Sequence, residues 1–108
     1  MTATSIAKTA LIRLTEGLAV SGAPHGLHAF AIHPGVVDTD LLRAYGVDLS
    51  RFTLDPPERA AVLCARLASG DYDALSGRFL RVDDDLDDLV GRAPEIVARQ
   101  LLTLRIKA

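Results

Sequence analysis

The chain has 108 residues, of which 49% are hydrophobic and 24% charged, so the length predicts one domain and the hydrophobic fraction excludes a disordered chain. A formal net charge of -2 argues against nucleic acid as a partner, and a single cysteine excludes a disulfide framework and a Cys-based zinc cluster. No apolar run reaches the roughly 18 residues of a membrane span and no signal peptide is recognisable, so we expect a soluble, cytoplasmic protein without membrane contacts.

The first predicted element is a helix from Ser5 to Ser21. Thr4 or Ser5 is a candidate cap for its start, and Gly22 with Pro24 ends it. Apolar residues at four-residue spacing predict a buried face on this helix. The residues of that face are Ile6, Ala10, Leu14 and Leu18, widened by Leu11.

A strand is predicted next, from Leu27 to His33. Its sequence is short and mostly apolar without alternation, which is typical of a strand buried on both faces in a parallel sheet. Pro34 cannot donate to a strand ladder, so the strand is expected to end before it.

The next segment, residues 36–57, is irregular, with a short helix expected near Thr39–Tyr45. A longer helix is predicted over Pro57–Ala68, with Asp55 as its cap and proline in its first turn. The side chains expected to be buried from this helix are Ala61, Val62, Cys64, Leu67 and Ala68.

The last part of the chain predicts a strand over Gly77–Val82, an acidic solvated connection and a final helix from about Pro94. That helix is expected to bury Ile96, Val97, Leu101 and Leu104. Two strands with a helix between them suggest a parallel crossover, and the predicted fold class is therefore α/β, a partial Rossmann-like layer.

The acidic run has alternating carboxylates at Asp83, Asp85 and Asp87, as a calcium loop does. The twelfth residue counted from Asp83 is Pro94, where such a loop requires a carboxylate. We therefore expect no metal site.

One stretch of the first helix resembles the active-site helix of the short-chain dehydrogenase/reductase (SDR) family. The residues that carry the resemblance are Thr4-Ser5-Ile6-Ala7-Lys8-Thr9-Ala10-Leu11. The family has Tyr-x-x-x-Lys here, and the resemblance implies that Lys8 binds the cofactor ribose and lowers the pKa of the catalytic acid. Thr4 stands at the position of the family tyrosine, and a threonine hydroxyl is a poor proton donor.

A second stretch, Phe30-Ala31-Ile32-His33-Pro34-Gly35-Val36-Val37-Asp38-Thr39, resembles the strand and loop that hold the nicotinamide in the same family. The resemblance implies that Pro34 and Gly35 bend the backbone around the ring, while the main chain of Val37 and the hydroxyl of Thr39 bind the carboxamide. His33 would approach the same region. Alone, Pro-Gly is a common turn, but its position one strand after Lys8 matches the family's order.

No G-x-G-x-x-G turn and no catalytic serine strand occur in the sequence, and the resemblance therefore covers only the C-terminal portion of a family chain. We expect a single, truncated segment of an NAD- or NADP-dependent oxidoreductase that neither binds the cofactor nor reacts alone. The alternatives are a non-catalytic interaction module, associating with itself or with a full-length relative, and a degraded or mis-started gene product of the family.

Overall fold

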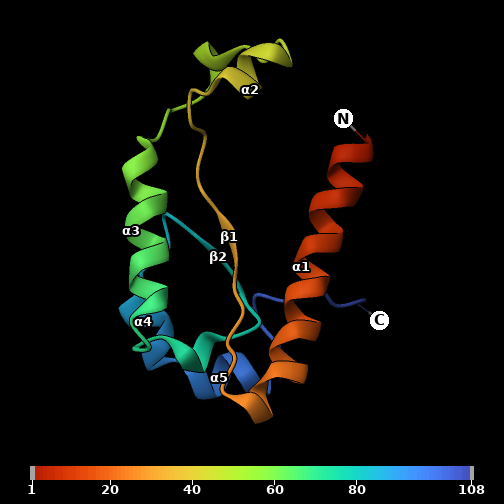
Figure 1. Cartoon of the computed structure of the whole chain (residues 1–108), viewed down its shortest axis with the longest axis vertical. Helices are drawn as coiled ribbons and strands as arrows, with labels where there is room; N and C mark the ends of the chain where they lie inside the picture. Colours follow the sequence, from red (N-terminus) through yellow and green to blue (C-terminus); the bar gives the residue numbers. More distant parts are fainter. Residues whose placement is uncertain (1, 108) are drawn as a thin grey trace.

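The computed structural model describes residues 2–107, and its centre is a pair of parallel strands between helices (Figure 1). Helix α1 (Thr2–Gly22) lies on one side of the strands and α3 (Pro57–Ala68) on the other. Strands β1 (Ala31–His33) and β2 (Phe79–Arg81) pair in parallel. The predicted parallel crossover is confirmed, and the arrangement is compatible with the α/β class.

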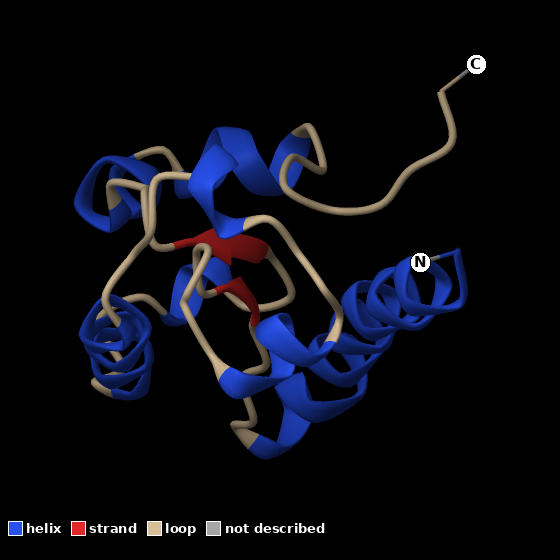
Figure 2. Ribbon diagram, turned by 90° about the horizontal axis from the view of Figure 1, so that it is seen from above, coloured by secondary structure: helices blue, strands red, loops and turns tan. Residues whose placement is uncertain are grey.

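The other elements are short helices that surround this centre, as Figure 2 shows from above. They are η1 (Ala23–His25), α2 (Asp40–Ala44), η2 (Leu49–Arg51), η3 (Asp73–Leu75), α4 (Leu86–Gly91) and α5 (Ala93–Ala98). The molecule is elongated, with extents of 43 × 31 × 27 Å. Its radius of gyration of 15.2 Å exceeds the value of about 13 Å typical of a compact domain of this size. None of the helices within residues 2–107 has the length and hydropathy needed to cross a lipid bilayer.

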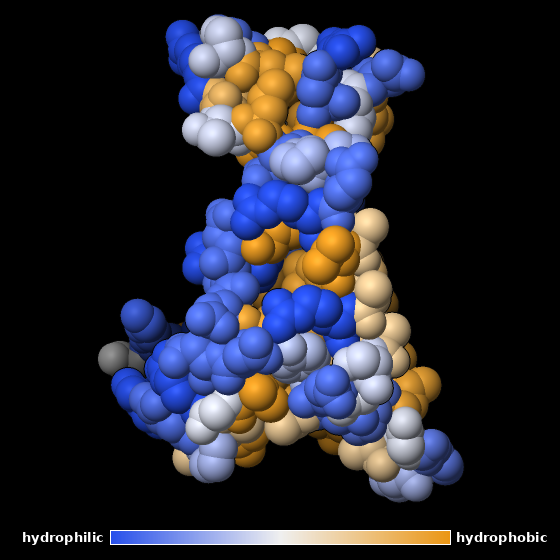
Figure 3. All heavy atoms as spheres, turned by 90° about the vertical axis from the view of Figure 1, so that its left-hand side faces the viewer, coloured by the Kyte–Doolittle hydropathy of each residue, from blue (hydrophilic) through white to orange (hydrophobic). Residues whose placement is uncertain are grey.

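The elongation comes from α2 and η2, which project at one end of the molecule (Figure 1). The short helix expected near Thr39–Tyr45 is confirmed, since Thr39 caps α2 and Tyr45 ends it. Hydrophobic atoms gather on the surface of this projection in Figure 3. Its exposed large apolar side chains are Leu41, Tyr45, Phe52 and Leu54.

Both strands are shorter than predicted, but the chain on either side of them still pairs. The amide of Gly77 donates to the carbonyl of Ala29 at 2.7 Å, and the amide of Val82 donates to the carbonyl of His33 at 3.2 Å. The expectation of burial on both faces is wrong for β1, because Ile32 is only half-buried and His33 is exposed. Because the sheet has only two strands in residues 2–107, one edge of β1 has no neighbouring strand, and β1 therefore remains partly exposed.

The hydrophobic core lies between α3, β2, α4 and α5. Its fully buried side chains are Leu75, Leu80, Leu86 and Ile96. Helix α3 contributes Leu63 and Leu67, whereas Val62 and the thiol-bearing Cys64 are exposed, which corrects the predicted face. Val62 is four residues from both Glu58 and Arg66 and so shares the polar side of this helix, whereas Leu63 and Leu67 pack into the core.

Helix α1 turns a different face to the sheet from the one predicted. The predicted stripe is exposed: Ile6, Ala10, Leu11, Leu14 and Leu18 all face solvent. The inward residues are the half-buried Thr4, Ile12, Thr15 and Ala19 and the buried Glu16 and Gly22. The helix also begins at Thr2, so neither Thr4 nor Ser5 caps it.

The acidic run after β2 is the predicted connection from a strand to a helix, and the side chains of Asp83, Asp87 and Asp88 are exposed on it. Its residues also have local roles: the carboxylate of Asp85 caps α4 by accepting from the amide of Asp88 at 3.1 Å. Asp87 accepts from the hydroxyl of the buried Tyr72 at 2.6 Å. Carboxylates in this run therefore act as a helix cap and as partners of core residues.

The last predicted helix ends early, because α5 stops at Ala98. Gln100 and Leu102 have φ values of 54° and 59°, a backbone conformation that interrupts a helix. The carbonyl of Leu102 instead accepts from the amide of Phe79 at 2.9 Å, which satisfies the start of β2.

Candidate functional site

A pocket of about 600 Å³ lies between α1 and β1. Lys8 and Ile12 line it from the helix, and His33 and Pro34 line it from the end of the strand. Phe79 of β2 meets the ring of His33 edge-on, with 6.4 Å between ring centroids. The structure thus brings together Lys8 and Pro34, which lie 26 residues apart in the sequence.

Thr4 and Lys8 share one face of α1 because they are four residues apart in a continuous helix. Thr4 is half-buried and Lys8 is exposed. The spacing needed for a proton donor next to a lysine is therefore present, but the side chain at the donor position is a short hydroxyl.

The turn after β1 requires glycine. Gly35 has a φ of 83°, and its amide donates to Nδ1 of His33 at 3.0 Å. A Cβ atom at this position would overlap the side chain of Asp55. Backbone conformation and space therefore both exclude other residues here.

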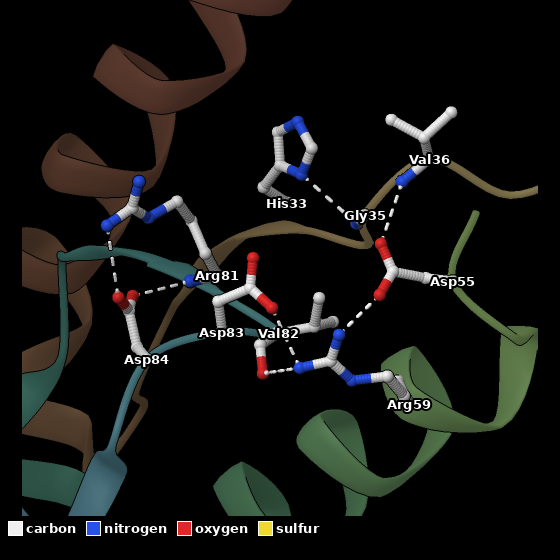
Figure 4. A network of polar contacts seen from close by, with 9 residues as sticks. All are labelled: His33, Gly35, Val36, Asp55, Arg59, Arg81, Val82, Asp83 and Asp84. Carbon is white, nitrogen blue, oxygen red and sulfur yellow. Dashed lines mark hydrogen bonds and ion pairs between the residues drawn. The ribbon is translucent and has the colours of Figure 1, made fainter. Parts of the chain in front are cut away.

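Asp55 and Arg59 hold this turn against the end of β2 (Figure 4). The carboxylate of Asp55 accepts from the backbone amide of Val36 at 3.2 Å, and the backbone amide of Asp55 donates to the carbonyl of Val36 at 2.7 Å. Arg59 donates to the Asp55 carboxylate, to the carbonyl of Val82 at 2.9 Å and to Asp83 at 2.8 Å. The hydrogen bonds to Asp83 and to Asp55, in that order of effect, raise the pKa of Arg59 above its usual value. We call these contacts the Asp55–Arg59 clamp.

The clamp corrects the predicted role of Asp55 as a helix cap. The N-cap of α3 is Pro56, which offers no side-chain hydrogen bond. The carboxylate of Asp55 is directed to the turn after β1 instead. The sequence pointed to Asp55 with another role and did not point to Arg59 as a functional residue, although an Asp and an Arg four residues apart at a helix start are a recognisable signal.

Val37 and Thr39 follow the turn but do not line the described pocket. The hydroxyl oxygen of Thr39 accepts from the amide of Leu42 at 3.3 Å and so caps α2. Neither main-chain group of Val37 has a partner within residues 2–107.

The polar groups of Val37 and Thr39 that have no partner among the described residues are of the kind that can bind a carboxamide. The main chain of Val37 can pair with a carboxamide, and the hydroxyl of Thr39 keeps its own proton to donate, because only its oxygen is engaged. Lys8 lines the pocket between α1 and β1, and Pro34, which precedes these two residues in the chain, lines it from the other side. The sequence offers no glycine-rich turn for the pyrophosphate. Within the described chain, no group of three or more His, Cys, Asp or Glu side chains is arranged to hold a metal ion.

Comparison with known proteins finds several relatives, each described as a short chain dehydrogenase. The short chain dehydrogenase mpl6 of Monascus purpureus is 35% identical over 99 residues, which are 92% of this chain and 34% of the relative. The short chain dehydrogenase andI of Emericella variicolor is 35% identical over 100 residues, or 93% of this chain and 34% of the relative. The chain spans about a third of the length of these curated relatives. No family model matches it, and no solved structure gives a significant match.

Proposed function

The chain belongs to the short-chain dehydrogenase family, and we propose that it forms the nicotinamide-facing part of an NAD(P)-dependent oxidoreductase. In this proposal β1 and β2 are two neighbouring strands of a Rossmann-like sheet. The observation that carries it is the meeting of Lys8 and Pro34 at one pocket. When bound, the nicotinamide ring would exchange a hydride with a carbonyl or alcohol substrate.

Each residue of the site has one proposed task. The amine of Lys8 binds ribose hydroxyls from α1, and the turn at Pro34 and Gly35 sets the direction of the loop around the ring. The main chain of Val37 and the hydroxyl of Thr39 bind the carboxamide. All these groups act by binding and orientation, so catalysis also needs a general acid, and Thr4 is too weakly acidic for that task.

The family tyrosine provides a direct test of the proposed site. We expect Thr4→Tyr to raise carbonyl reduction by about 100-fold or more in a chimaera that joins this chain to the remaining part of mpl6, because a positioned general acid contributes about that much. Initial rates of NADPH or NADH oxidation measure the effect. The 108-residue chain alone is expected to bind neither cofactor in the micromolar range, which titration calorimetry checks.

Two matched variants make the result specific. Ala3→Tyr places the same phenol about 100° round the helix from the Thr4 position, and it should leave the rate unchanged. Lys8→Met in the Thr4→Tyr background should remove most of the gain. Equal rates with Thr4 and with tyrosine at this position would contradict the assignment of the site.

A second candidate function is a non-catalytic interaction module, and the outer face of α1 favours it. Four of its large apolar side chains are between 47% and 66% exposed: Ile6, Leu11, Leu14 and Leu18. Exposed apolar patches of this kind mark association surfaces, and an unpaired strand edge adds a second means of pairing. The partner in this proposal is a second copy of the chain or a full-length relative.

Leu14→Glu tests the association. We expect the chain to self-associate at tens of micromolar and the variant to shift strongly towards monomer, because a carboxylate in an apolar interface loses its hydration. Light scattering coupled to size exclusion measures the mass. The control is Val62→Glu, on the exposed side of α3, which should not change the mass. A monomeric parent chain that unfolds cooperatively would contradict the self-association.

A further inference from the structure

The proposed carboxamide-binding groups lie in a stretch of chain without regular structure. Strand β1 ends at His33 and α2 begins at Asp40, so Val37 belongs to neither. The main-chain hydrogen bonds of a helix or strand therefore do not fix the direction of its N–H group. A binding group on a loop keeps a defined direction only where other contacts hold the backbone around it.

An ion pair holds the chain on each side of Val37, and the two pairs have different anchors. Asp38 accepts from Nε and Nη2 of Arg43 at 2.8 and 2.7 Å, which ties the loop to the projecting helix α2. The Asp55–Arg59 clamp ties the loop to the end of β2. The side chain of Asp55 is only 16% exposed, against 38% for Asp38, so water competes less for its hydrogen bonds. The clamp is therefore the contact that connects the loop with the strands.

The clamp sets the direction of the Val37 N–H group through a peptide plane. The backbone amide of Asp55 donates to the carbonyl of Val36 at 2.7 Å, and the carboxylate of Asp55 accepts from the Val36 amide at 3.2 Å. The Val36 carbonyl and the Val37 N–H belong to one peptide unit, which is planar and, since no cis bond occurs among residues 2–107, trans. A hydrogen bond that holds this carbonyl toward Asp55 therefore makes the Val37 N–H point away from Asp55.

Arg59 fixes Asp55 in turn by joining it to both strands (Figure 4). Its Nη1 donates to the Asp55 carboxylate, and its Nη2 donates to the carbonyl of Val82 at 2.9 Å. The amide of Val82 donates to the carbonyl of His33 at 3.2 Å, so the end of β2 is bound to the end of β1. These contacts form a closed ring that runs from His33 through the turn to the clamp and back through Val82. A closed ring leaves the turn fewer conformations than a single contact does.

We propose that Asp55 and Arg59 are positioning residues of the nicotinamide site, which direct the main-chain N–H of Val37 toward the carboxamide oxygen of the cofactor. The inference rests on the proposed function. Neither clamp side chain is among those that line the described pocket between α1 and β1, so both act through Val36 rather than on the cofactor. A donor that already has its direction loses less conformational entropy on binding, which strengthens binding of the nicotinamide end in particular.

The first measurement concerns the 108-residue chain without cofactor. Amide hydrogen exchange is followed residue by residue with mass spectrometry, at a concentration below the range in which self-association is expected. We expect the Val36 amide to exchange about fivefold faster or more in Arg59→Gln, because its acceptor Asp55 loses a charged partner that holds it in place.

Two controls separate a local effect from a loss of stability. The Ala31 amide, which donates to the Arg78 carbonyl between the strands, should exchange at the parent rate in Arg59→Gln. Arg99→Gln breaks a pair with Glu95 that has the same four-residue spacing at the end of α5, and it should change neither rate. Equal acceleration at Val36 and Ala31 would show that Arg59 stabilises the fold as a whole, and it overturns the positioning role.

The second measurement compares two ligands of the mpl6 chimaera by titration calorimetry. NADH contains the nicotinamide ring and ADP-ribose does not; for a site that prefers NADPH, its ring-free counterpart takes the place of ADP-ribose. We expect Arg59→Gln to weaken binding of the nicotinamide dinucleotide about threefold or more and to leave the affinity for the ring-free ligand unchanged. Arg59→Lys keeps the charge but has one nitrogen in place of the fork, so a smaller loss of dinucleotide affinity is expected.

The outcomes distinguish this inference from the proposed function. A loss confined to the nicotinamide dinucleotide, together with faster exchange of the Val36 amide, supports the positioning role. Equal losses for both ligands, or an unchanged dinucleotide affinity, overturn it. A parent chimaera that binds ADP-ribose as tightly as NADH contradicts the proposed nicotinamide site and with it this inference, while the exchange rates still report whether the clamp holds the turn. Should Arg59→Gln fail to fold, Arg59→Lys replaces it, and a dinucleotide affinity equal to that of the parent overturns the positioning role.

Discussion

Gly35→Ala is expected to destabilise the protein by about 3 kcal/mol. About 1 kcal/mol or more comes from forcing an L-residue into the left-handed backbone region at a φ of 83°. The rest comes from the new Cβ, which displaces the carboxylate of Asp55 and so disrupts its bonds to Val36 and Arg59. Unfolding in urea, monitored by circular dichroism, measures the loss.

Gly46→Ala is the matched control for this prediction. Gly46 has a φ of 68°, but no atom lies within 4 Å of the position of its Cβ. Its substitution should therefore cost only the backbone part, about 1 kcal/mol. A further variant, Asp55→Ala in the Gly35→Ala background, should cost less than Asp55→Ala does alone, because the two sites are coupled. Equal losses for the two glycines would show that the clamp does not constrain the turn.

Glu16→Gln is expected to destabilise the protein by about 2 kcal/mol at neutral pH. Glu16 is 7% exposed and joins α1 to the C-terminal segment through Leu104 and Arg105. Removing one partner of a buried ion pair costs about 3–5 kcal/mol, and the cost is smaller here because Arg13 and Arg105 reach solvent. Because glutamine can still accept the hydrogen bond from the Leu104 amide, the difference in the free energy of unfolding reports the loss of the negative charge.

The effect of Glu16 depends on pH in a defined direction. Burial alone would raise its pKa, but the Leu104 amide, Arg105 and Arg13 together hold the pKa below its usual value. Ionised Glu16 therefore stabilises the fold fully above its unfolded pKa of about 4.3, and this contribution is lost as the pH falls through the folded pKa.

Urea unfolding of the parent chain and of Glu16→Gln at a series of acidic pH values should show that their free energies of unfolding converge as the pH falls. The control is Glu95→Gln, a surface carboxylate paired with Arg92 and Arg99, which should have a much smaller effect at neutral pH. A constant difference between the parent chain and Glu16→Gln at all pH values would contradict the role of the charge.

Local patterns in the sequence predicted the long helices and both strands in their observed order, but not the short helix α4 before α5. Apolar runs, prolines and glycines placed α1 and α3 close to their observed bounds and located both strands, although the strands are shorter than predicted, because these signals act within a few residues of where they occur. Local signals also identified the turn at Pro34 and Gly35, whose backbone conformation is a property of two neighbouring residues. Family membership followed from the same short motifs and is confirmed by the relatives.

The tertiary structure alone decided which faces are buried and which carboxylates have partners. The apolar stripe of α1 is a valid helical pattern. A different face of the helix nevertheless packs against the rest of the protein, because Ala19 lies close to Gly77 and Glu16 pairs with Arg105. The two residues of this second contact lie 89 positions apart. Periodicity describes only how side chains are arranged around one helix, whereas burial depends on the segments that fold against it. For the same physical reason, the Asp55–Arg59 clamp depends on the tertiary structure, which brings the turn at Val36 and the end of β2 to the start of α3.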